Sequence, residues 1–565
     1  MWTNRMAEGS FISKIPPRLM PWLIALAGAL LFLPFLGKTH LFDWDEINFA
    51  ECAREMLITK KYFLVTINYL PFWEKPPLFI WMQSLAMNIF GVTDYAARLP
   101  NAICGIATFV ILYKIGALVK DRRFGLLWVL AYAGSLLPHF YFKSGIIDPW
   151  FNFFIFTSIY FFMRVQMQKK NLITGKENLF IILSAFMLGL AIITKGPVAL
   201  LIFSIGFVIY WFIEKRRAIL SLGQLFLFAI VLLASGGLWF GAEIITGHRD
   251  VISQFFEYQI RLFKTEDAGH GGPFYFHVII LLIGCFPASI FAFRGMSSEM
   301  KDDEKGREVS LWMGILFWVT LILFSIVKTK IIHYSSLCYY PLTYFAALAM
   351  SNLIDGDVKW RKWMSWGLCI TGGLIAIALI GLPIAGMNAQ AIINSGLLKD
   401  PFANANLQAD IPWSFTDCLL GIFLLSTIVI SIILFHKGNA KRGIIIMFLG
   451  GLITTNLALA VIAPKIELLS QQAAIDFYQG LKGKNVYVTT IGFKSYAHYF
   501  YSNEQPSGNL NSTSEDWLLK GELDKPAYFV CKVNNINDWK KWYPQLKEIG
   551  RKNGFVFLER EVSGK

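Results

Sequence analysis

The sequence predicts a multi-pass α-helical membrane protein with a small α/β domain at its C-terminus. Of its 565 residues, 55% are hydrophobic and only 16% are charged, whereas a soluble protein carries about a quarter charged residues. Phe and Trp occur 49 and 18 times, as expected for surfaces that face lipid and its interface. The net charge of +14 does not indicate nucleic-acid binding, because the basic residues form short clusters between apolar runs rather than one soluble basic face.

A run of roughly 20 mostly apolar residues is needed to cross a membrane, and the chain contains about thirteen such candidates. The first follows a basic stretch with Arg5, Lys14 and Arg18, and no small-residue cleavage site follows it, so we expect an uncleaved first span. The candidates lie near residues 21–37, 97–119, 124–138, 149–165, 178–194, 196–213, 221–242, 275–294, 310–327, 332–353, 363–386, 414–435 and 443–463.

The connections between these spans indicate how the chain is oriented. If the N-terminus is cytoplasmic and the spans alternate, every connection expected to face inward is basic. Cytoplasmic loops carry an excess of Lys and Arg, so this pattern favours an odd number of spans and an outward C-terminus. The basic clusters lie at 120–123, 164–176, 215–217, 294–307, 359–362 and 437–442.

The chain divides into a membrane domain at 1–465 and an outward, periplasmic α/β domain at 466–565. The first outward loop, 38–96, is not apolar enough to span, and its two helix-like stretches at 45–60 and 75–90 could lie flat in the interface. In the C-terminal domain, β-rich runs alternate with helical patterns. The expected strands contain 485–488, 527–530 and 555–558, and the expected helices are 473–481 and 539–549.

Polar residues gather at the outward ends of the predicted spans. Ionisable groups near lipid cost several kcal/mol unless they are paired or hydrated, so by default they mark function. Lys and Arg would hold a phosphate, and a carboxylate would remove a proton from an acceptor; together they suit a reaction on a phosphate-bearing lipid. The candidate site residues are Asp45, Glu46, Glu74, Lys75, Asp148, Lys195, Arg261, His270, His333 and Tyr334.

Each of these residues also has a structural interpretation. Asp45 and Glu46 could cap the helix that follows them. Lys195 could simply extend its ammonium group toward the interface, and His270 and His333 could be structural hydrogen-bonding residues. The functional interpretation therefore depends on their convergence on one face of the membrane.

No metal or other cofactor is expected. The seven cysteines are scattered, without a CxxC or Cys/His cluster, so a zinc site is not predicted. Asp43, Asp45, Glu46 and Glu74 could hold a divalent cation, but Lys and Arg are available to supply the same positive charge.

Several motifs follow one another along the chain: Asp45-Glu46, Ala50-Glu51, Arg54 to Met56, Phe72 to Leu78, Phe90-Gly91, Ala96 to Pro100, Asp148, Thr194 to Pro197, Arg261, and Lys330 to Tyr334 ahead of Pro341. Their order and spacing resemble those of the membrane glycosyltransferases of the aminoarabinose (lipid A) transferase and protein O-mannosyltransferase superfamily. The resemblance covers about residues 20–350. At the first motif the aminoarabinose transferases usually read Asp-Glu-Ala-Arg-Tyr, whereas this chain has Asn48 and Phe49 in place of the last two residues.

This resemblance implies a GT-C fold and an enzyme that moves a sugar from a polyprenyl (undecaprenyl) phosphate carrier with inversion of the anomeric centre. Asp45, with Glu46 beside it, would be the base or the acceptor-orienting group. Lys75, Lys195, Arg261 and Tyr334 would bind the donor phosphate. The residues expected to line the same cavity are Glu74, Asp148, His270 and His333.

The expected setting is a bacterial inner membrane, with the site facing the periplasm and with lipid A, another envelope glycan or a protein as acceptor. One alternative is a secondary transporter or lipid flippase, which would show inverted repeats and charges near the bilayer midplane. A second is a glycan polymerase or ligase that uses a diphosphate-linked oligosaccharide. The identity of the donor separates the second alternative from the first interpretation.

Overall fold

The structure is a computed structural model that describes residues 15–216, 219–266, 270–297, 300 and 302–562. Arg5 and Lys14 of the basic N-terminal stretch lie outside these residues. Parts of the predicted basic clusters at 215–217 and 294–307 also lie outside the described residues, as do the extreme ends of the two predicted domains.

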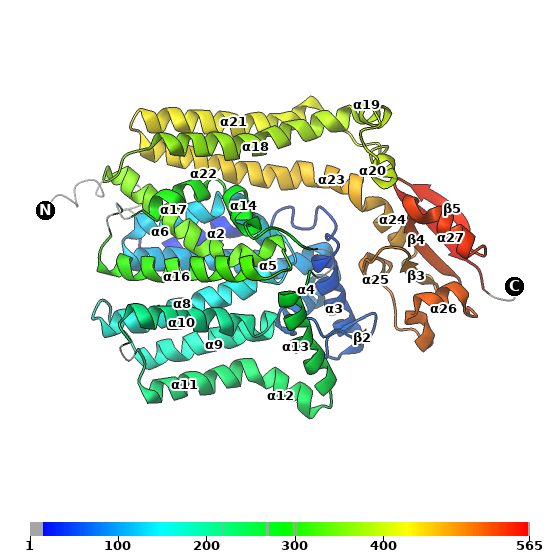
Figure 1. Cartoon of the computed structure of the whole chain (residues 1–565), viewed down its shortest axis with the longest axis horizontal. Helices are drawn as coiled ribbons and strands as arrows, with labels where there is room; N and C mark the ends of the chain where they lie inside the picture. The colour runs from blue at the N-terminus through cyan, green and yellow to red at the C-terminus, as the bar shows by residue number, and fades with distance from the viewer. Residues whose placement is uncertain (1–14, 217–218, 267–269, 298–299, 301, 563–565) are drawn as a thin grey trace.

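Long helices run side by side and form most of the molecule (Figure 1). Among the described residues, eight segments are long and apolar enough to cross a membrane, and the count is up to ten if two bent helix pairs are each one span. The eight are α5 (Asp94–Val119), α9 (Glu177–Lys195), α11 to α12 (Leu222–Ile245), α16 (Glu304–Ile326), η4 with α17 (Ile332–Asp355), α18 (Lys362–Met387), α21 (Phe415–His436) and α22 to α23 (Ala440–Ser470).

Two predicted spans are bent. The run near 124–138 forms α6 (Arg122–Ala133) and a second segment, Leu136–Lys143, at 85° to it, and the run near 275–294 forms α14 (Phe276–Gly284) and α15 (Ala288–Gly295) at 109°. Every predicted run overlaps a helix, but the count of thirteen crossings stays a prediction. The remaining helices of this part are α2 (Met20–Phe32), α8 (Asp148–Lys169), α10 (Val198–Ile213), α13 (Arg249–Lys264), α19 (Ala389–Asn394) and α20 (Pro401–Asn406).

The loop after α2 contains the two helices predicted there. The first is α3 (Asp45–Thr59), as expected. The second is α4 (Leu78–Phe90), which begins at Leu78 rather than near 75, because Lys75 and Pro76 each precede a proline and such residues disfavour the helical conformation. A two-residue hairpin separates them, with strands β1 (Thr66–Ile67) and β2 (Leu70–Pro71).

A four-stranded sheet lies at one end of the molecule (Figure 1), with strand order β3-β4-β6-β5. Strands β3 and β4 are parallel and the other pairs are antiparallel. The strands predicted at 527–530 and 555–558 and the helix near 473–481 are confirmed, whereas the strand predicted at 485–488 begins two residues later, at Tyr487. The elements are α24 (Gln472–Gly480), β3 (Tyr487–Thr490), α25 (Ala497–Ser502), α26 (Glu515–Lys520), β4 (Ala527–Lys532), α27 (Ile536–Trp542), β5 (Lys547–Lys552) and β6 (Phe555–Arg560).

The predicted helix at 539–549 is wrong over its second half. Helix α27 ends at Trp542, Pro544 follows it, and Lys547–Lys552 is edge strand β5 instead. This strand is polar and mostly exposed, so its sequence lacks the apolar alternation of a half-buried strand. It is held by antiparallel pairing to β6 through the turn at Asn553-Gly554, where Asn553 has φ 52°.

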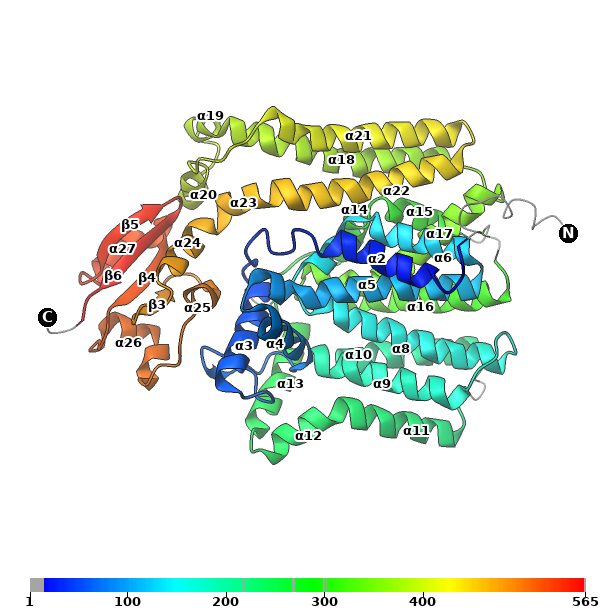
Figure 2. The ribbon, with the colours of Figure 1, turned by 180° about the vertical axis from the view of Figure 1, so that it is seen from behind.

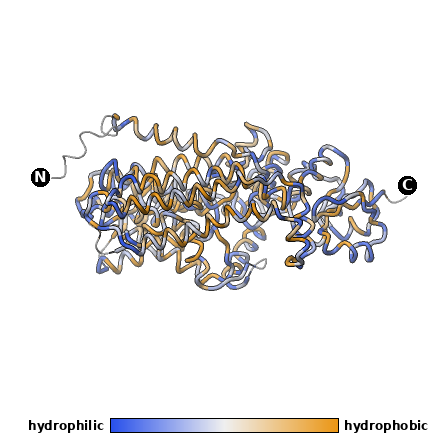
Figure 3. The backbone as a smooth tube through the Cα atoms, turned by 90° about the horizontal axis from the view of Figure 1, so that it is seen from above, coloured by the Kyte–Doolittle hydropathy of each residue, from blue (hydrophilic) through white to orange (hydrophobic). Residues whose placement is uncertain are grey.

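The basic connections lie at one end of the helix bundle, and the sheet lies at the other end. Lys170 pairs with Glu214 and with Glu308, each at 2.7 Å, so three of the predicted inward segments meet. Figures 1 and 2 show the sheet at the opposite end of the bundle from these connections. In Figure 3 hydrophobic residues dominate the long helices, while hydrophilic ones are frequent in the connections and the sheet.

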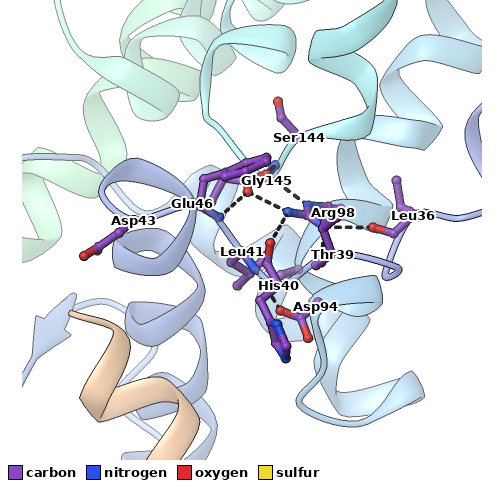
Figure 4. A network of polar contacts seen from close by, with 12 residues as sticks. Leu36, Thr39, His40, Leu41, Asp43, Glu46, Asp94, Arg98, Ser144 and Gly145 are labelled. Atoms are coloured by element: carbon purple, nitrogen blue, oxygen red, sulfur yellow. Dashed lines mark hydrogen bonds and ion pairs between the residues drawn. The ribbon is translucent and has the colours of Figure 1, made fainter. Parts of the chain in front are cut away.

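A buried ion pair holds the first loop against α5 (Figure 4). The guanidinium group of Arg98 donates to both carboxylate oxygens of Glu46, at 3.1 and 2.8 Å. It also donates to the backbone carbonyls of Leu36, Thr39 and His40, at 2.7 to 3.0 Å. Glu46 in turn accepts from the backbone N–H of Phe42 at 2.8 Å and from that of Gly145. Both charges are therefore fully hydrogen-bonded although almost no solvent reaches them.

The C-terminal unit contacts this same loop. Tyr501 of α25 accepts a hydrogen bond from the Leu41 N–H at 2.7 Å and donates one to Asp94, the first residue of α5, at 2.6 Å. Arg54 of α3 donates to the side-chain oxygen of Asn503 at 3.1 Å. The sheet is thus joined to the residues just before and within α3.

Replacing Arg98 by Ala should lower the free energy of unfolding by about 3–5 kcal/mol, because it leaves the Glu46 carboxylate buried without its partner. Unfolding by denaturing detergent in mixed micelles measures this. The matched control is Arg123→Ala, which breaks a partly exposed pair with Asp355 and should cost less than about 1 kcal/mol. Equal losses in the two variants would contradict the anchoring role of Arg98.

Candidate active site

Asp148 and Lys195 form an ion pair at the outer rim of the bundle, by which we mean the end that carries the sheet. Asp148 is the first residue of α8 and Lys195 is the last residue of α9. These two helices are consecutive in the chain and pack against each other. An antiparallel hairpin of helices brings those two ends together. The Lys195 ammonium lies 2.5 Å from Asp148 Oδ1, and both charges lie at the helix ends where the helix dipoles favour them.

The turn after Lys195 requires a glycine. Gly196 has φ +108°, in the left-handed region, and a Cβ at this position would lie 2.6 Å from the ring of Phe255. Helix α9 therefore stops at Lys195, and Pro197 precedes α10. The Lys-Gly-Pro motif fixes where the lysine side chain leaves the helix.

His333 lies between two carboxylates from distant parts of the chain. Its Nε2 atom is 3.5 Å from Asp45 Oδ2 and 3.6 Å from Asp148 Oδ2. The Asp45 side chain is 31% exposed, whereas that of Asp148 is only 3% exposed. Of the two, Asp45 is thus the carboxylate that an incoming substrate can reach.

Tyr334 follows His333 and contacts the lysine of the ion pair. The Lys195 ammonium lies 4.9 Å from the centre of the Tyr334 ring, a distance at which the ring face attracts a cation. The short helix η4 (Ile332–Cys338) therefore presents two neighbouring side chains to this cluster.

Lys75 and Arg261 meet at one aromatic ring. The Lys75 ammonium is 4.9 Å and the Arg261 guanidinium 5.1 Å from the centre of the Tyr258 ring. Trp73 also packs on this ring, at 5.4 Å. Burial lowers the pKa of Lys75, and the nearby carboxylates of Glu74 and Asp45 partly oppose this while the Lys195 charge adds to it. Lys75 is thus in electrostatic contact with the residues around His333.

Seven of the ten predicted side chains are joined by these contacts: Asp45, Lys75, Asp148, Lys195, Arg261, His333 and Tyr334. Glu74 is half-buried beside Lys75. Glu46 instead belongs to the Arg98 network, where its oxygens are fully engaged. The His270 side chain is exposed, and its backbone carbonyl accepts from the Lys330 N–H at 2.7 Å.

Lys330 has a structural task that its sequence context did not reveal. Its buried ammonium donates to the carbonyls of Phe324, Ser325 and Val327, at the end of α16. It therefore satisfies helix-end carbonyls that otherwise lack partners. Within the described residues, no group of three His, Cys, Asp or Glu side chains could hold a metal ion.

The sequence alone did not single out Tyr258, although its ring contacts two of the predicted basic residues, Lys75 and Arg261. It lies three residues before Arg261 on α13, so both side chains share one face of that helix. That spacing was the available signal, because an aromatic ring between two basic groups can position both of them.

Comparison with known proteins gives both sequence and structural relatives. Residues 74–239 match the family model of the dolichyl-phosphate-mannose-protein mannosyltransferases. A protein of Pectobacterium carotovorum, named undecaprenyl phosphate-alpha-4-amino-4-deoxy-L-arabinose arabinosyl transferase, is 26% identical over 375 residues, which is 65% of each chain. A protein of the same name from Aeromonas salmonicida is also 26% identical over 375 residues, 65% of this chain and 66% of its own. The match thus spans about 65% of the length of these curated relatives.

Among solved structures, the crystal structure of ArnT from Cupriavidus metallidurans bound to undecaprenyl phosphate superposes with a TM-score of 0.75 at 16% identity, over 97% of this chain and 99% of that one. The chain has the ArnT fold. It is a helical membrane protein with a GT-C fold like that of ArnT, and the resemblance found in its short motifs is confirmed. An archaeal oligosaccharyltransferase from Archaeoglobus fulgidus aligns less well, with a TM-score of 0.52 at 11% identity, over 93% of this chain and 71% of that one.

The lowered pKa of Lys75 predicts a pH dependence for the binding of a phosphate-bearing lipid. Raising the pH should neutralise Lys75 before ordinary lysines, which titrate near 10.5. Each lost charge-assisted contact should weaken binding by about 10- to 100-fold. Titration of a phosphate-bearing lipid between pH 8 and 10.5 should show this loss in the wild type.

The variant Lys75→Arg should keep its affinity to a higher pH, because arginine stays charged throughout. The control Lys61→Arg changes an exposed lysine and should follow the wild-type curve. Parallel curves for the wild type and Lys75→Arg would show that Lys75 does not carry the interaction.

Proposed function

We propose that this chain is an inverting glycosyltransferase that moves a monosaccharide from an undecaprenyl-phosphate carrier to an acceptor outside the membrane. The observation that carries the proposal is the cluster at the outer rim, where the accessible Asp45 carboxylate lies across His333 from the Asp148–Lys195 pair. The ArnT fold and the names of the relatives support the choice of carrier.

In the proposed reaction, the Asp45 carboxylate takes the proton of an acceptor hydroxyl. The hydroxyl oxygen forms a bond to the anomeric carbon while the bond from that carbon to the phosphate oxygen breaks. The electron pair leaves with the phosphate, and polyprenyl phosphate is released. Attack from the side opposite the phosphate inverts the anomeric centre.

The basic residues stabilise the charge that develops on the leaving phosphate. Lys75, Lys195 and Arg261 are assigned to this task, and Tyr334 donates its hydroxyl proton in a hydrogen bond to the same group. Preorganised cations of this kind stabilise a transition state without reorganisation at the moment of reaction. Since they supply positive charge at the phosphate, no divalent cation is assigned a step.

The other predicted residues have supporting tasks. His333 orients Asp45 and Asp148, and Glu74 tunes the charge of Lys75. Glu46 is a positioning residue rather than a catalytic one, because its oxygens are occupied by Arg98 and two backbone N–H groups. His270 is assigned no direct task, since its side chain is exposed.

The proposed setting is a bacterial inner membrane, crossed thirteen times by a domain at 1–465, with the rim cluster and the domain at 466–565 in the periplasm. The basic connections at the opposite end of the bundle support this orientation. The relatives are named for 4-amino-4-deoxy-arabinose. Asn48 and Phe49 depart from their usual first motif, so lipid A, another envelope glycan and a protein all stay candidate acceptors.

Replacing Asp45 by Asn should reduce sugar transfer by about 100- to 10,000-fold, the usual contribution of a general base. Binding of undecaprenyl phosphate should persist, because the phosphate-binding cations are untouched. Purified protein supplied with carrier-linked sugar and candidate acceptors, with products identified by mass spectrometry, measures the transfer.

The matched control is Asp410→Asn, whose side chain is exposed and makes none of the contacts of the rim cluster. It should keep nearly full activity. Full activity in Asp45→Asn would refute the role assigned to Asp45.

A further inference from the structure

A second cavity lies mainly in the C-terminal unit, and Asn68 of the first loop completes its wall. Its volume is about 510 Å³, and it opens where the chain leaves strand β3. Its wall is formed by the segment after β3, by α25, by the residues before α26, and by Trp539 of α27. In open α/β sheets, ligands bind outside the carboxyl ends of parallel strands, and β3 pairs in parallel with β4.

The wall combines aromatic rings with hydroxyl groups, and it also includes the side chains of Lys494, Glu504 and Glu515. Tyr496, Tyr499 and Trp539 contribute rings, and Thr490, Ser512 and Thr513 contribute hydroxyls. A sugar ring has an apolar face of C–H groups and a rim of hydroxyls, so it can pack on aromatic faces while its rim exchanges hydrogen bonds. Aromatic residues with a polar tip suit such half-polar ligands.

Four side-chain atoms, on three residues that line this cavity, have no hydrogen-bond partner within the described chain. Both ring nitrogens of His498, Nε1 of Trp539 and Oε2 of Glu504 are buried and have no hydrogen-bond partner there. His498 is only 2% exposed. Buried polar groups are nearly always hydrogen-bonded, and each exception needs an explanation. The three side chains that carry these atoms all line one cavity.

The charge state of these groups favours a neutral ligand. Burial lowers the pKa of His498 to about 3, so its imidazole is neutral, with one donor and one acceptor nitrogen. Burial, and the nearby carboxylate of Glu51, raise the pKa of Glu504 to about 8, so at neutral pH this carboxyl is mostly protonated and donates. Such neutral donors and acceptors match the hydroxyl groups of a sugar, and Lys494 adds a cation to the same wall.

Gly492 keeps the indole N–H of Trp539 open. Its φ is +76°, and a Cβ there would lie 3.0 Å from Trp539 Nε1. Any side chain at this position would therefore be strained and would crowd the unpartnered donor.

The cavity adjoins the proposed catalytic carboxylate. The ring of Tyr496 packs on that of Trp44 at 5.8 Å, and Trp44 directly precedes Asp45. Helix α25, which carries His498, contacts α3, which begins at Asp45. We propose that this cavity binds the neutral sugar of the acceptor and presents the acceptor to the rim cluster. The binding of carbohydrate rests on the cavity alone; its identity as the acceptor rests on the proposed function.

The test measures binding rather than activity. Full-length protein in lipid nanodiscs is titrated with the β-1,6-linked N-acetylglucosamine disaccharide and with maltose, followed by saturation-transfer difference NMR, and with inorganic phosphate in competition. The wild type should bind at least one disaccharide saturably, and phosphate should not displace it. Absence of saturable disaccharide binding, or displacement by phosphate, would overturn the inference.

Two variants locate the binding. His498→Phe should weaken it about tenfold or more, because it removes two hydrogen-bonding atoms, while the melting temperature should not fall, since those atoms have no partner in the protein. Trp539→Phe should also weaken it, and the control Trp542→Phe, at a 61% exposed neighbour outside the cavity, should not. Wild-type affinity in both His498→Phe and Trp539→Phe would overturn the assignment.

The proposed reaction and the proposed carbohydrate site can be refuted independently of each other. Asp45→Asn should bind the disaccharide normally. If transfer is absent in the wild type but binding still depends on His498, the cavity is a carbohydrate site and the proposed reaction is wrong. If transfer occurs and His498→Phe binds like the wild type, the reaction stands and the cavity inference is wrong.

Discussion

Arg98 lies inside a helix long enough to cross the membrane, yet all of its donors are used by one short segment of the first loop. A charge in that position would be costly without partners, so the loop must fold back onto α5 and supply the Glu46 carboxylate and three backbone carbonyls. This fixes the first turn of α3. Asp45, the residue before Glu46, is thereby directed to the other side of the helix start, toward His333.

The rest of the site follows from the ends of packed helices. Asp148 begins α8, Lys195 ends α9 and η4 begins just before His333, so the fold of the bundle brings three separate segments to one rim. Opposite charges there neutralise one another in the free protein. A carrier phosphate would compete with Asp148 for Lys195, and partial desolvation of Lys75 makes that lysine a stronger partner for a phosphate than a fully hydrated one.

The sequence was sufficient to predict the helical runs, the sheet and most of the rim cluster, because hydropathy, charge asymmetry and motif order are local properties. Long-range pairing was not visible in it. In the sequence, Glu46 looks equivalent to Asp45. The structure shows that Arg98, 52 residues later, forms an ion pair with Glu46. Strand β5 is polar and is defined by its neighbour β6, so its own residues gave no strand signal. The cavity around His498 likewise depends on residues from several separate elements and on Asn68 of the first loop.

The central claim is that Asp45, Lys75, Lys195 and Arg261 serve one pocket at the rim that bears the C-terminal sheet. A cryo-EM structure of the full-length protein in nanodiscs with undecaprenyl phosphate tests it most directly. The account predicts phosphate density within hydrogen-bonding distance of Lys75 and Lys195, with the Asp45 carboxylate facing the position of the sugar. Phosphate density away from these residues, or at the end of the bundle that carries the basic connections, would contradict it.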